Sequence, residues 1–148
     1  METGQDLSDL SDIYAGVKTV LEAANTKLRV YTEPPSGAMQ YPCLVMEQDI
    51  TVDYGIALSG NSWDVRLPAT LYVRHGKPEV AWQEIQKYVS PTGTESIKAG
   101  VESDNTLNNA VDDSELDGLV TVQRDIDDEN RFWTFSARFV IHALETIA

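Results

Sequence analysis

The hydrophobic positions of the chain repeat with two different periods. Near the N-terminus they recur every three or four residues, as on the buried face of a helix. This stripe comprises Leu7, Leu10, Ile13, Tyr14, Val17, Val20, Leu21 and Ala24. It predicts a helix from about Leu7 to Asn25, inside which Gly16 costs roughly 1 kcal/mol relative to alanine.

A second helical layer is predicted from Trp82 to Val111, between two groups of strands. Its longest helix follows Pro78, which suits a first turn, and ends before Pro91, because proline disfavours helical backbone in the residue before it. The apolar stripe of this helix consists of Val80, Ala81, Ile85, Tyr88 and Val89. We interpret these residues as part of the core, and we expect the three tryptophans, Trp63, Trp82 and Trp133, to contribute to it as well.

Two shorter helical segments are predicted after Pro91. In the first, Ile97 and Val101 lie four residues apart on one face, and Thr92 or Thr94 is expected to cap the helix. The second is a single helical turn at Thr106 to Val111. Both segments complete the layer that we expect to cover the sheet.

Period-two alternation dominates the rest of the chain and predicts strands with one buried face. One strand alternates through Trp63, Val65, Leu67, Ala69, Leu71 and Val73, with Asp64, Arg66, Thr70 and Arg74 on the other face. Pro68 interrupts it, so this strand is expected at a sheet edge or with a bulge. A final hairpin is predicted from Leu119–Arg124 and Arg131–Leu144, with Asp125–Asn130 as its turn. Its long strand directs one set of side chains to the core floor: Trp133, Phe135, Ala137, Phe139, Ile141 and Ala143.

Two short strands are predicted at Lys27–Thr32 and Cys43–Gln48, separated by a Pro-Pro-Ser-Gly loop. From Asp49 to Asn61 the polarity is mixed, and we expect an extended arm that projects and contacts a neighbouring subunit or another protein. Its candidate interface residues are Tyr54, Ile56 and Leu58. The prediction is a single α+β domain over residues 1–148, with helices on one face of an antiparallel or mixed sheet and a protruding β-hairpin arm.

One run of sequence resembles a known family. A helix ending in Tyr-Val-Ser-Pro-Thr-Gly precedes Ser-Ile-Lys-Ala-Gly-Val-Glu, an Asp-Asn-Thr-Leu turn, an acidic segment and a final hairpin. This order is similar to that of the tail terminator proteins of siphophages infecting actinobacteria, most clearly from Pro42 to Ala148. The resemblance implies helices on a mostly antiparallel sheet and a homohexameric ring that caps the tail tube at the neck.

The resemblance also implies partners and a location. The ring would contact the major tail tube protein and a head-to-tail connector or stopper protein, and DNA would pass through its lumen without specific binding. The protein would be made in the host cytoplasm and carried in the virion tail. Two alternatives stay open: another connector or minor tail protein of the same virion, and a small-ligand or peptide-binding domain unrelated to phage.

The net charge of −13 argues against tight binding to nucleic acid, which requires clustered Lys and Arg. The acids concentrate between Val101 and Asn130, where Arg124 is the one basic residue. Carboxylates facing a ring lumen would repel passing phosphates. The lumen candidates are Asp112, Asp113, Glu115, Asp117, Asp125, Asp127, Asp128 and Glu129. Their other interpretation is a solvated surface that keeps the protein soluble.

No motif indicates catalysis, a metal or a cofactor, and we expect none of the three. The acids of 125–129 lack the glycine and distant glutamate of a helix-loop-helix calcium loop. His75 and His142 lie in no nucleophile motif, and a structural role is expected for both. The lone Cys43 is expected to be a buried apolar residue, and no run of residues is long and apolar enough to span a membrane.

Overall fold

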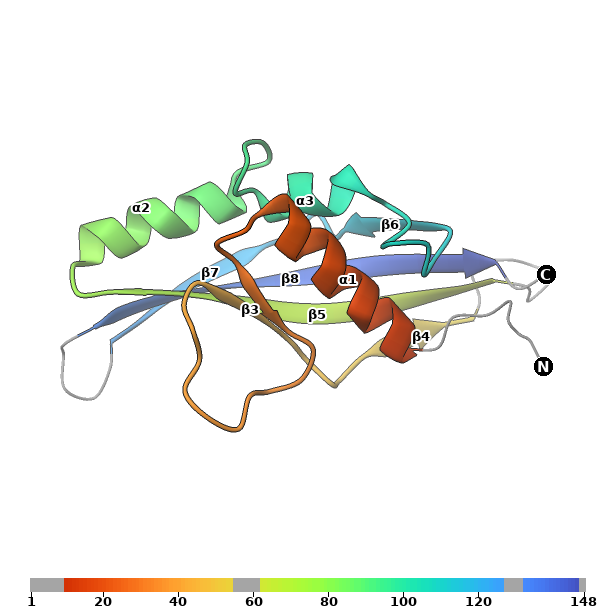
Figure 1. Cartoon of the computed structure of the whole chain (residues 1–148), viewed down its shortest axis with the longest axis horizontal. Helices are drawn as coiled ribbons and strands as arrows, with labels where there is room; N and C mark the ends of the chain where they lie inside the picture. The colour runs from red at the N-terminus through yellow and green to blue at the C-terminus, as the bar shows by residue number, and fades with distance from the viewer. Residues whose placement is uncertain (1–9, 55–61, 127–131, 147–148) are drawn as a thin grey trace.

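A computed structural model of the chain describes residues 10–54, 62–126 and 132–146. These residues form the predicted α+β fold, with three helices and an open, mixed sheet of seven strands. Two long strands, β5 (Ser62–His75) and β8 (Trp133–Thr146), pair antiparallel over their whole length. They run through the length of the molecule as its central spine (Figure 1).

Short strands extend the sheet on both sides of this spine. β3 (Cys43–Met46) and β4 (Thr51–Asp53) pair one after the other with β5, and β2 (Arg29–Tyr31) pairs with β3 in parallel. β6 (Asp113–Leu116) and β7 (Thr121–Ile126) pair one after the other with β8. The last two strands therefore form the sheet border opposite to β2.

The helices α1 (Leu10–Ala24), α2 (Pro78–Val89) and α3 (Ile97–Ser103) cover one face of this sheet (Figure 1). The predicted caps of α3 were wrong. Ser96 caps this helix, because its hydroxyl accepts a hydrogen bond from the N–H of Ala99 and donates one to the carbonyl of Ser90. The predicted stripe of α2 also included Val80, which is 39% exposed.

The alternating strands form the core floor as predicted. Val65, Leu67, Ala69, Leu71 and Val73 of β5 are all fully buried. Their neighbours on β8 are buried too: Phe135, Ala137, Phe139, Ile141 and Ala143. Period-two alternation indicates one buried face directly, so these assignments required no tertiary information. Cys43 is fully buried, also as predicted.

Pro68 does not lie at a sheet edge, contrary to one of the two predictions for it. It is opposite Val140 of β8, in the middle of the longest ladder. Its carbonyl accepts the N–H of Glu47 at 2.9 Å, so its main-chain groups face the residues that connect β3 to β4. β3 pairs with residues 69–72 of β5 and β4 with residues 64–66, so Pro68 lies between these two ladders. Proline is tolerated there because no ladder hydrogen bond requires its missing N–H.

The segment from Thr106 to Val111 forms a turn, but a left-handed one, and the prediction of an ordinary helical turn was wrong. Leu107, Asn108 and Asn109 have φ values of 51°, 59° and 66°, in the left-handed region. The carbonyl of Thr106 accepts the N–H groups of Ala110 at 2.9 Å and Val111 at 3.0 Å, which closes a left-handed turn. Asparagine tolerates this conformation better than most residues, and Leu107 is held in it by complete burial.

The predicted arm is in part a strand of the sheet. Thr51–Asp53 pairs with residues 64–66 of β5, so this portion does not stand off the domain. The remainder of the predicted arm, residues 55–61 with Ile56 and Leu58, lies outside the described residues. The first strand of the last hairpin extends two residues further than predicted, because Asp125 and Ile126 belong to β7. The rest of the predicted turn, residues 127–130, lies outside the described residues.

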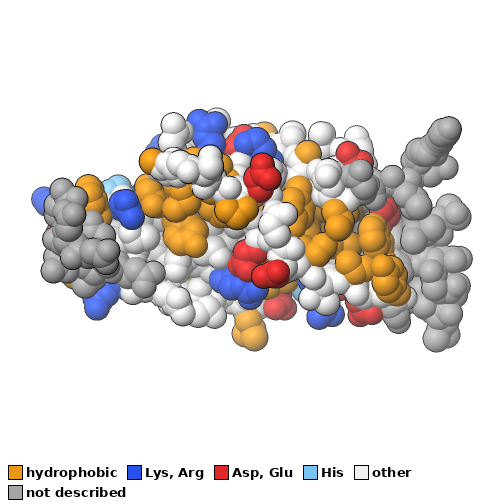
Figure 2. All heavy atoms as spheres, turned by 90° about the horizontal axis from the view of Figure 1, so that it is seen from below, with side chains coloured by type: hydrophobic (Ala, Val, Ile, Leu, Met, Phe, Trp, Pro, Cys, Tyr) orange, Lys and Arg blue, Asp and Glu red, His pale blue; other side chains and the backbone are white. Residues whose placement is uncertain are grey.

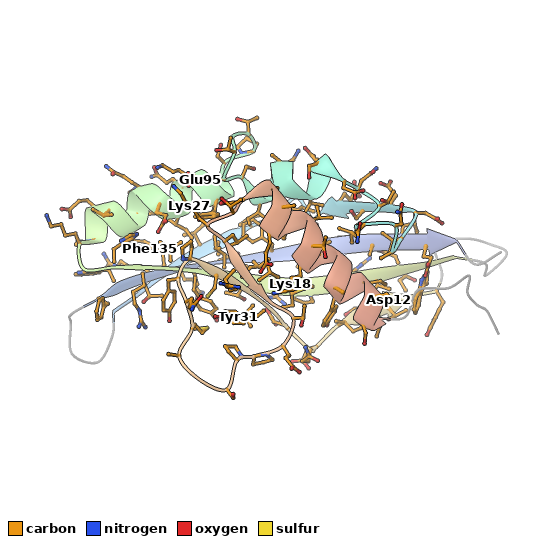
Figure 3. The ribbon with its side chains drawn as sticks, viewed as in Figure 1. Asp12, Lys18, Lys27, Tyr31, Glu95 and Phe135 are labelled. Carbon is orange, nitrogen blue, oxygen red and sulfur yellow. The ribbon has the colours of Figure 1, made fainter. Side chains whose placement is uncertain are left out.

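A side-chain clamp joins α1 to the edge strand β2. The Glu22 carboxylate accepts the Val30 N–H at 2.9 Å, and the Lys18 ammonium donates to the Val30 carbonyl at 2.9 Å and to Glu22 at 3.1 Å. Figure 3 shows Lys18 on the side of α1 that faces this strand. Burial raises the pKa of Glu22, but the Val30 N–H and Lys18 together hold it below its usual value.

Replacing Glu22 by glutamine is expected to lower stability at pH 7 by about 1 kcal/mol, because two charge-assisted hydrogen bonds weaken. A carboxylate with a lowered pKa stabilises the fold above its unfolded pKa and loses that contribution as pH falls. The difference between parent and variant should therefore be largest at neutral pH and shrink as the pH falls through the lowered pKa of Glu22. Urea unfolding at several pH values measures it. The matched control is Glu102→Gln, since Glu102 forms only an exposed ion pair with Lys98.

Candidate interaction surfaces

The predicted interface residue Tyr54 is 67% exposed at the end of β4. Its ring stacks on that of Trp63, with centroids 6.5 Å apart and an interplanar angle of 17°. Trp63 is itself fixed by a 3.1 Å hydrogen bond from its indole N–H to Glu145. An aromatic side chain exposed to this extent indicates a contact surface at the β4–β5 end of the sheet.

Half of the predicted lumen acids can be placed with their side chains. Asp112, Asp113, Glu115 and Asp117 are exposed on β6 and its flanks. Asp125 lies in β7, and Asp127, Asp128 and Glu129 lie outside the described residues. Asp113 and Glu115 border a hollow of about 320 Å³, shared with Asp64, Ser114, His142 and Leu144. The sheet thus adds Asp64, distant in sequence, to the acidic surface.

Asp64 is only 9% exposed and is the ion-pair centre of this hollow. Its carboxylate lies 3.2 Å from Nδ1 of His142 and 3.4 Å from Nε of Arg66. His75 similarly pairs with Glu84 at 2.6 Å. Both histidines therefore have structural carboxylate partners. Among the described residues, no group of three or more His, Cys, Asp or Glu is arranged to hold a metal ion.

The only cysteine is not placed for nucleophilic chemistry. Burial raises the pKa of the Cys43 thiol to about 11, and Arg74 offsets this only in part. A thiol in that state is almost wholly protonated at neutral pH and reacts slowly. Arg74 itself lies over the rings of Tyr41 and Phe132, with its guanidinium 4.6 and 5.5 Å from their centroids.

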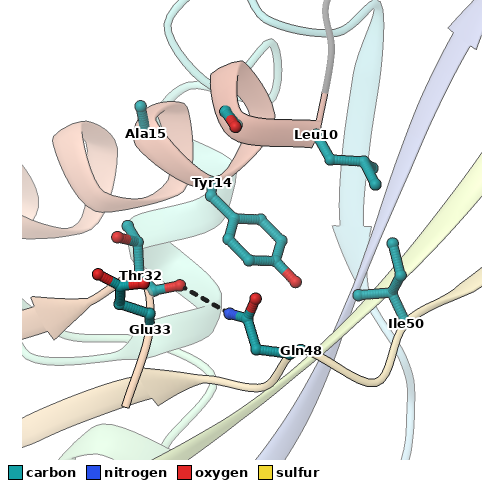
Figure 4. A pocket seen from close by; sticks show the side chains of 8 residues that line it. Leu10, Tyr14, Ala15, Thr32, Glu33, Gln48 and Ile50 are labelled. Carbon is teal, nitrogen blue, oxygen red and sulfur yellow. Dashed lines mark hydrogen bonds between the residues drawn. The ribbon is translucent and has the colours of Figure 1, made fainter. Parts of the chain in front are cut away.

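A second hollow, of about 350 Å³, lies between α1, the end of β2 and the connection from β3 to β4 (Figure 4). Gln48 closes one side by donating to the carbonyl of Thr32 at 3.1 Å. The Tyr14 hydroxyl donates to the carbonyl of Glu47 at 2.7 Å, and burial raises its pKa. Because these polar groups already satisfy one another, the hollow offers little to a ligand.

An apolar trough of about 610 Å³ lies between α2 and β7. Trp82 of α2 is 47% exposed, and its ring lies 5.4 Å from that of Phe135, at an angle of 46°. Figure 3 shows Phe135 beneath α2, toward one end of the sheet. The trough is lined by Pro78, Glu79, Trp82, Val122, Gln123, Arg124 and Phe135. We call this set the α2–β7 trough.

The trough exists because the helical layer ends before the sheet does. Helix α2 packs on β5 and β8, and β7 is one strand further out. Val122 is opposite the buried Ala137, so it points to the helix side of the sheet without a helix above it. The sequence counted Trp82 as core material. The sequence did contain a sign that Trp82 is exposed, because Trp82 falls outside the buried stripe of Ala81, Ile85 and Tyr88.

Seen from below, the molecule carries acidic and basic side chains close together near its middle, with apolar side chains gathered on both sides of them (Figure 2). Ion pairs of this kind join distant segments, as Arg138 does with Glu47 at 3.1 Å. Glu47 therefore has a basic partner on β8.

No protein-family model matches the chain, and no curated protein matches it significantly. None of the helices in the described ranges is long and apolar enough to cross a membrane. The described residues thus offer three surfaces: an apolar trough at one end of the sheet, the exposed Tyr54 ring stacked on the half-buried Trp63 at the other, and an acidic border along β6.

Proposed function

We propose that the protein is a structural virion protein, a phage tail terminator that assembles into a homohexameric ring on the end of the tail tube. The observation that supports this most is the placement of two exposed apolar surfaces at opposite ends of one elongated sheet, the α2–β7 trough and the Tyr54–Trp63 pair. Unlike surfaces on one chain allow head-to-tail contacts, which close into a ring when the rotation permits.

The sequence resemblance supplies the particular role within the virion. The ring would stop polymerisation of the major tail tube protein and present its other side to a head-to-tail connector or stopper protein. The protein would then be carried in the virion tail at the neck, after synthesis in the host cytoplasm.

Addition of the purified protein to polymerising tail tube protein from the same phage tests the proposal. Rings viewed by electron microscopy, and tubes that carry one ring at an end and stop growing, are the expected result. Tubes of unchanged length would contradict the terminator role. Rings that bind only isolated connectors would favour the alternative of another neck protein.

The acidic border provides a separate prediction. If Asp112, Asp113, Glu115 and Asp117 face the lumen, replacing all four by lysine should make assembled rings retain duplex DNA. The retention should weaken steeply with salt, because the Debye length falls to about 8 Å at physiological ionic strength. Retention of a labelled DNA duplex on immobilised rings measures it.

The matched control reverses four exposed acids outside the β6 border, Asp12, Glu33, Glu79 and Glu102, so that the change of net charge is the same. Controls that bind DNA equally would assign the effect to net charge alone. In that case the acids of the β6 border keep the protein soluble and have no role in the lumen.

A further inference from the structure

The two outer borders of the sheet differ in how their main-chain groups are satisfied. On the β2 border, Glu22 and Lys18 bond both the N–H and the carbonyl of Val30. Such side-chain capping blocks the addition of another strand. On the β7 border, the described residues make no comparable bond to the main chain of Val122 or Arg124.

The register shows which groups of β7 are open. Asp117 donates its N–H to the carbonyl of Val140 at 2.8 Å, so even-numbered residues of β8 direct their main-chain groups toward β6 and β7. Ser136 and Arg138 therefore bond Gln123 and Thr121. The main-chain groups of Val122 and Arg124 point outward, and their side chains line the trough.

An open strand edge beside an apolar trough suits one kind of occupant. An extended segment can pair with the edge through its main chain while every second side chain enters the trough. The segment must therefore be apolar at alternate positions. The sequence contains such a pattern where β4 ends, at Tyr54, Ile56 and Leu58, and Tyr54 is the most exposed aromatic residue among the described ones.

Tyr54 lies far from the trough of its own chain. Asp53 is opposite Asp64, whereas Val122 is in register with Ala137 and Leu71, seven residues further along β5. At about 3.3 Å per residue this separates them by about 23 Å along the sheet.

We propose that the α2–β7 trough is the docking site for a second copy of this chain, which enters by its β4–β5 end with the segment that begins at Tyr54. Strand addition at the open edge of β7 then places Tyr54 of the entering copy against Trp82, Val122 and Phe135. The contact is head-to-tail, because each copy offers its trough to one neighbour and its β4–β5 end to the other. This inference rests on the proposed ring and specifies its subunit contact.

Three substitutions test the contact by analytical ultracentrifugation. Trp82→Arg places a charge in the trough, Arg124→Pro removes an outward N–H from the edge, and Tyr54→Arg changes the entering segment. Each is expected to convert the oligomer of the parent protein to monomer. The control is Leu119→Arg, since Leu119 is 82% exposed outside both surfaces and its replacement should leave the oligomer intact. Circular dichroism verifies that each variant is folded.

Mixing distinguishes a head-to-tail contact from a symmetric one. Trp82→Arg retains an intact β4–β5 end, and Tyr54→Arg retains an intact trough. A mixture of the two should form dimers, and neither should form them alone. An oligomer that survives both Trp82→Arg and Tyr54→Arg would overturn this contact and leave the ring itself standing. A parent protein that stays monomeric at every concentration would overturn both.

Discussion

Replacing Gly16 by alanine is expected to destabilise the protein by about 2 kcal/mol, although alanine is the better helix former. Alanine gains roughly 1 kcal/mol in helix propensity. Its Cβ, however, would lie 2.2 Å from the carbonyl oxygen of Leu107 and 3.1 Å from the carbonyl carbon. Because the obstacle is backbone, no rotamer change relieves it, and overpacking of this kind costs about 3 kcal/mol.

A graded series separates this contact from a general effect of glycine replacement. A Cβ at Gly100 would meet only the end of the Leu21 side chain at 2.8 Å, which can move. At Gly37 it would meet nothing within 4 Å. Chemical unfolding should therefore rank the three alanine variants with Gly16→Ala far below Gly100→Ala, and Gly37→Ala near the parent. A stable Gly16→Ala variant would contradict the packing of the left-handed turn on α1.

Proline at position 123 is expected to unfold the protein or cost about 3 kcal/mol, whereas proline at position 124 should cost much less. The N–H of Gln123 belongs to the β7–β8 ladder, and proline removes that bond and places its ring against β8. The N–H of Arg124 points away from β8, where proline is tolerated on an edge strand. The loss at Arg124 is confined to the contact of its guanidinium with the Trp133 ring, 5.3 Å from the centroid.

Urea unfolding of both variants measures the difference directly. Valine at the same positions is the control, since it keeps both N–H groups and suits a strand. Equal losses for Gln123→Pro and Arg124→Pro would show that the register of β7 is different from the one described. The outward direction of the Arg124 N–H would then no longer support strand addition at this edge.

The sequence alone determined the two long strands and the principal helices. A side chain in a strand faces the core or solvent according to its parity, so Leu67, Leu71 and Phe139 could be assigned by counting. The stripe of α1 was equally readable, through Ile13 and Val17. These signals are local, because each residue is compared only with its near neighbours in the chain.

The candidate interaction surfaces depended on contacts between distant segments. Tyr54 could be proposed from its apolar character in a polar segment, but Asp64 became part of the acidic surface only because β5 and β8 pair and bring it to His142. Trp82 was assigned to the core because its exposure depends on where α2 ends relative to β7. No pattern within one helix states how far the neighbouring sheet extends.

The sequence by itself therefore showed which face of each helix and strand is buried, because the helical and strand periods are properties of the local backbone. Only the tertiary structure decided the hand of the turn at Leu107, because its left-handed conformation is held by burial against Gly16. It also decided that Pro68 is tolerated inside the sheet and that β2 is capped while β7 is open. Each of these depends on a partner far away in the chain, and its position follows from the packing of the whole fold.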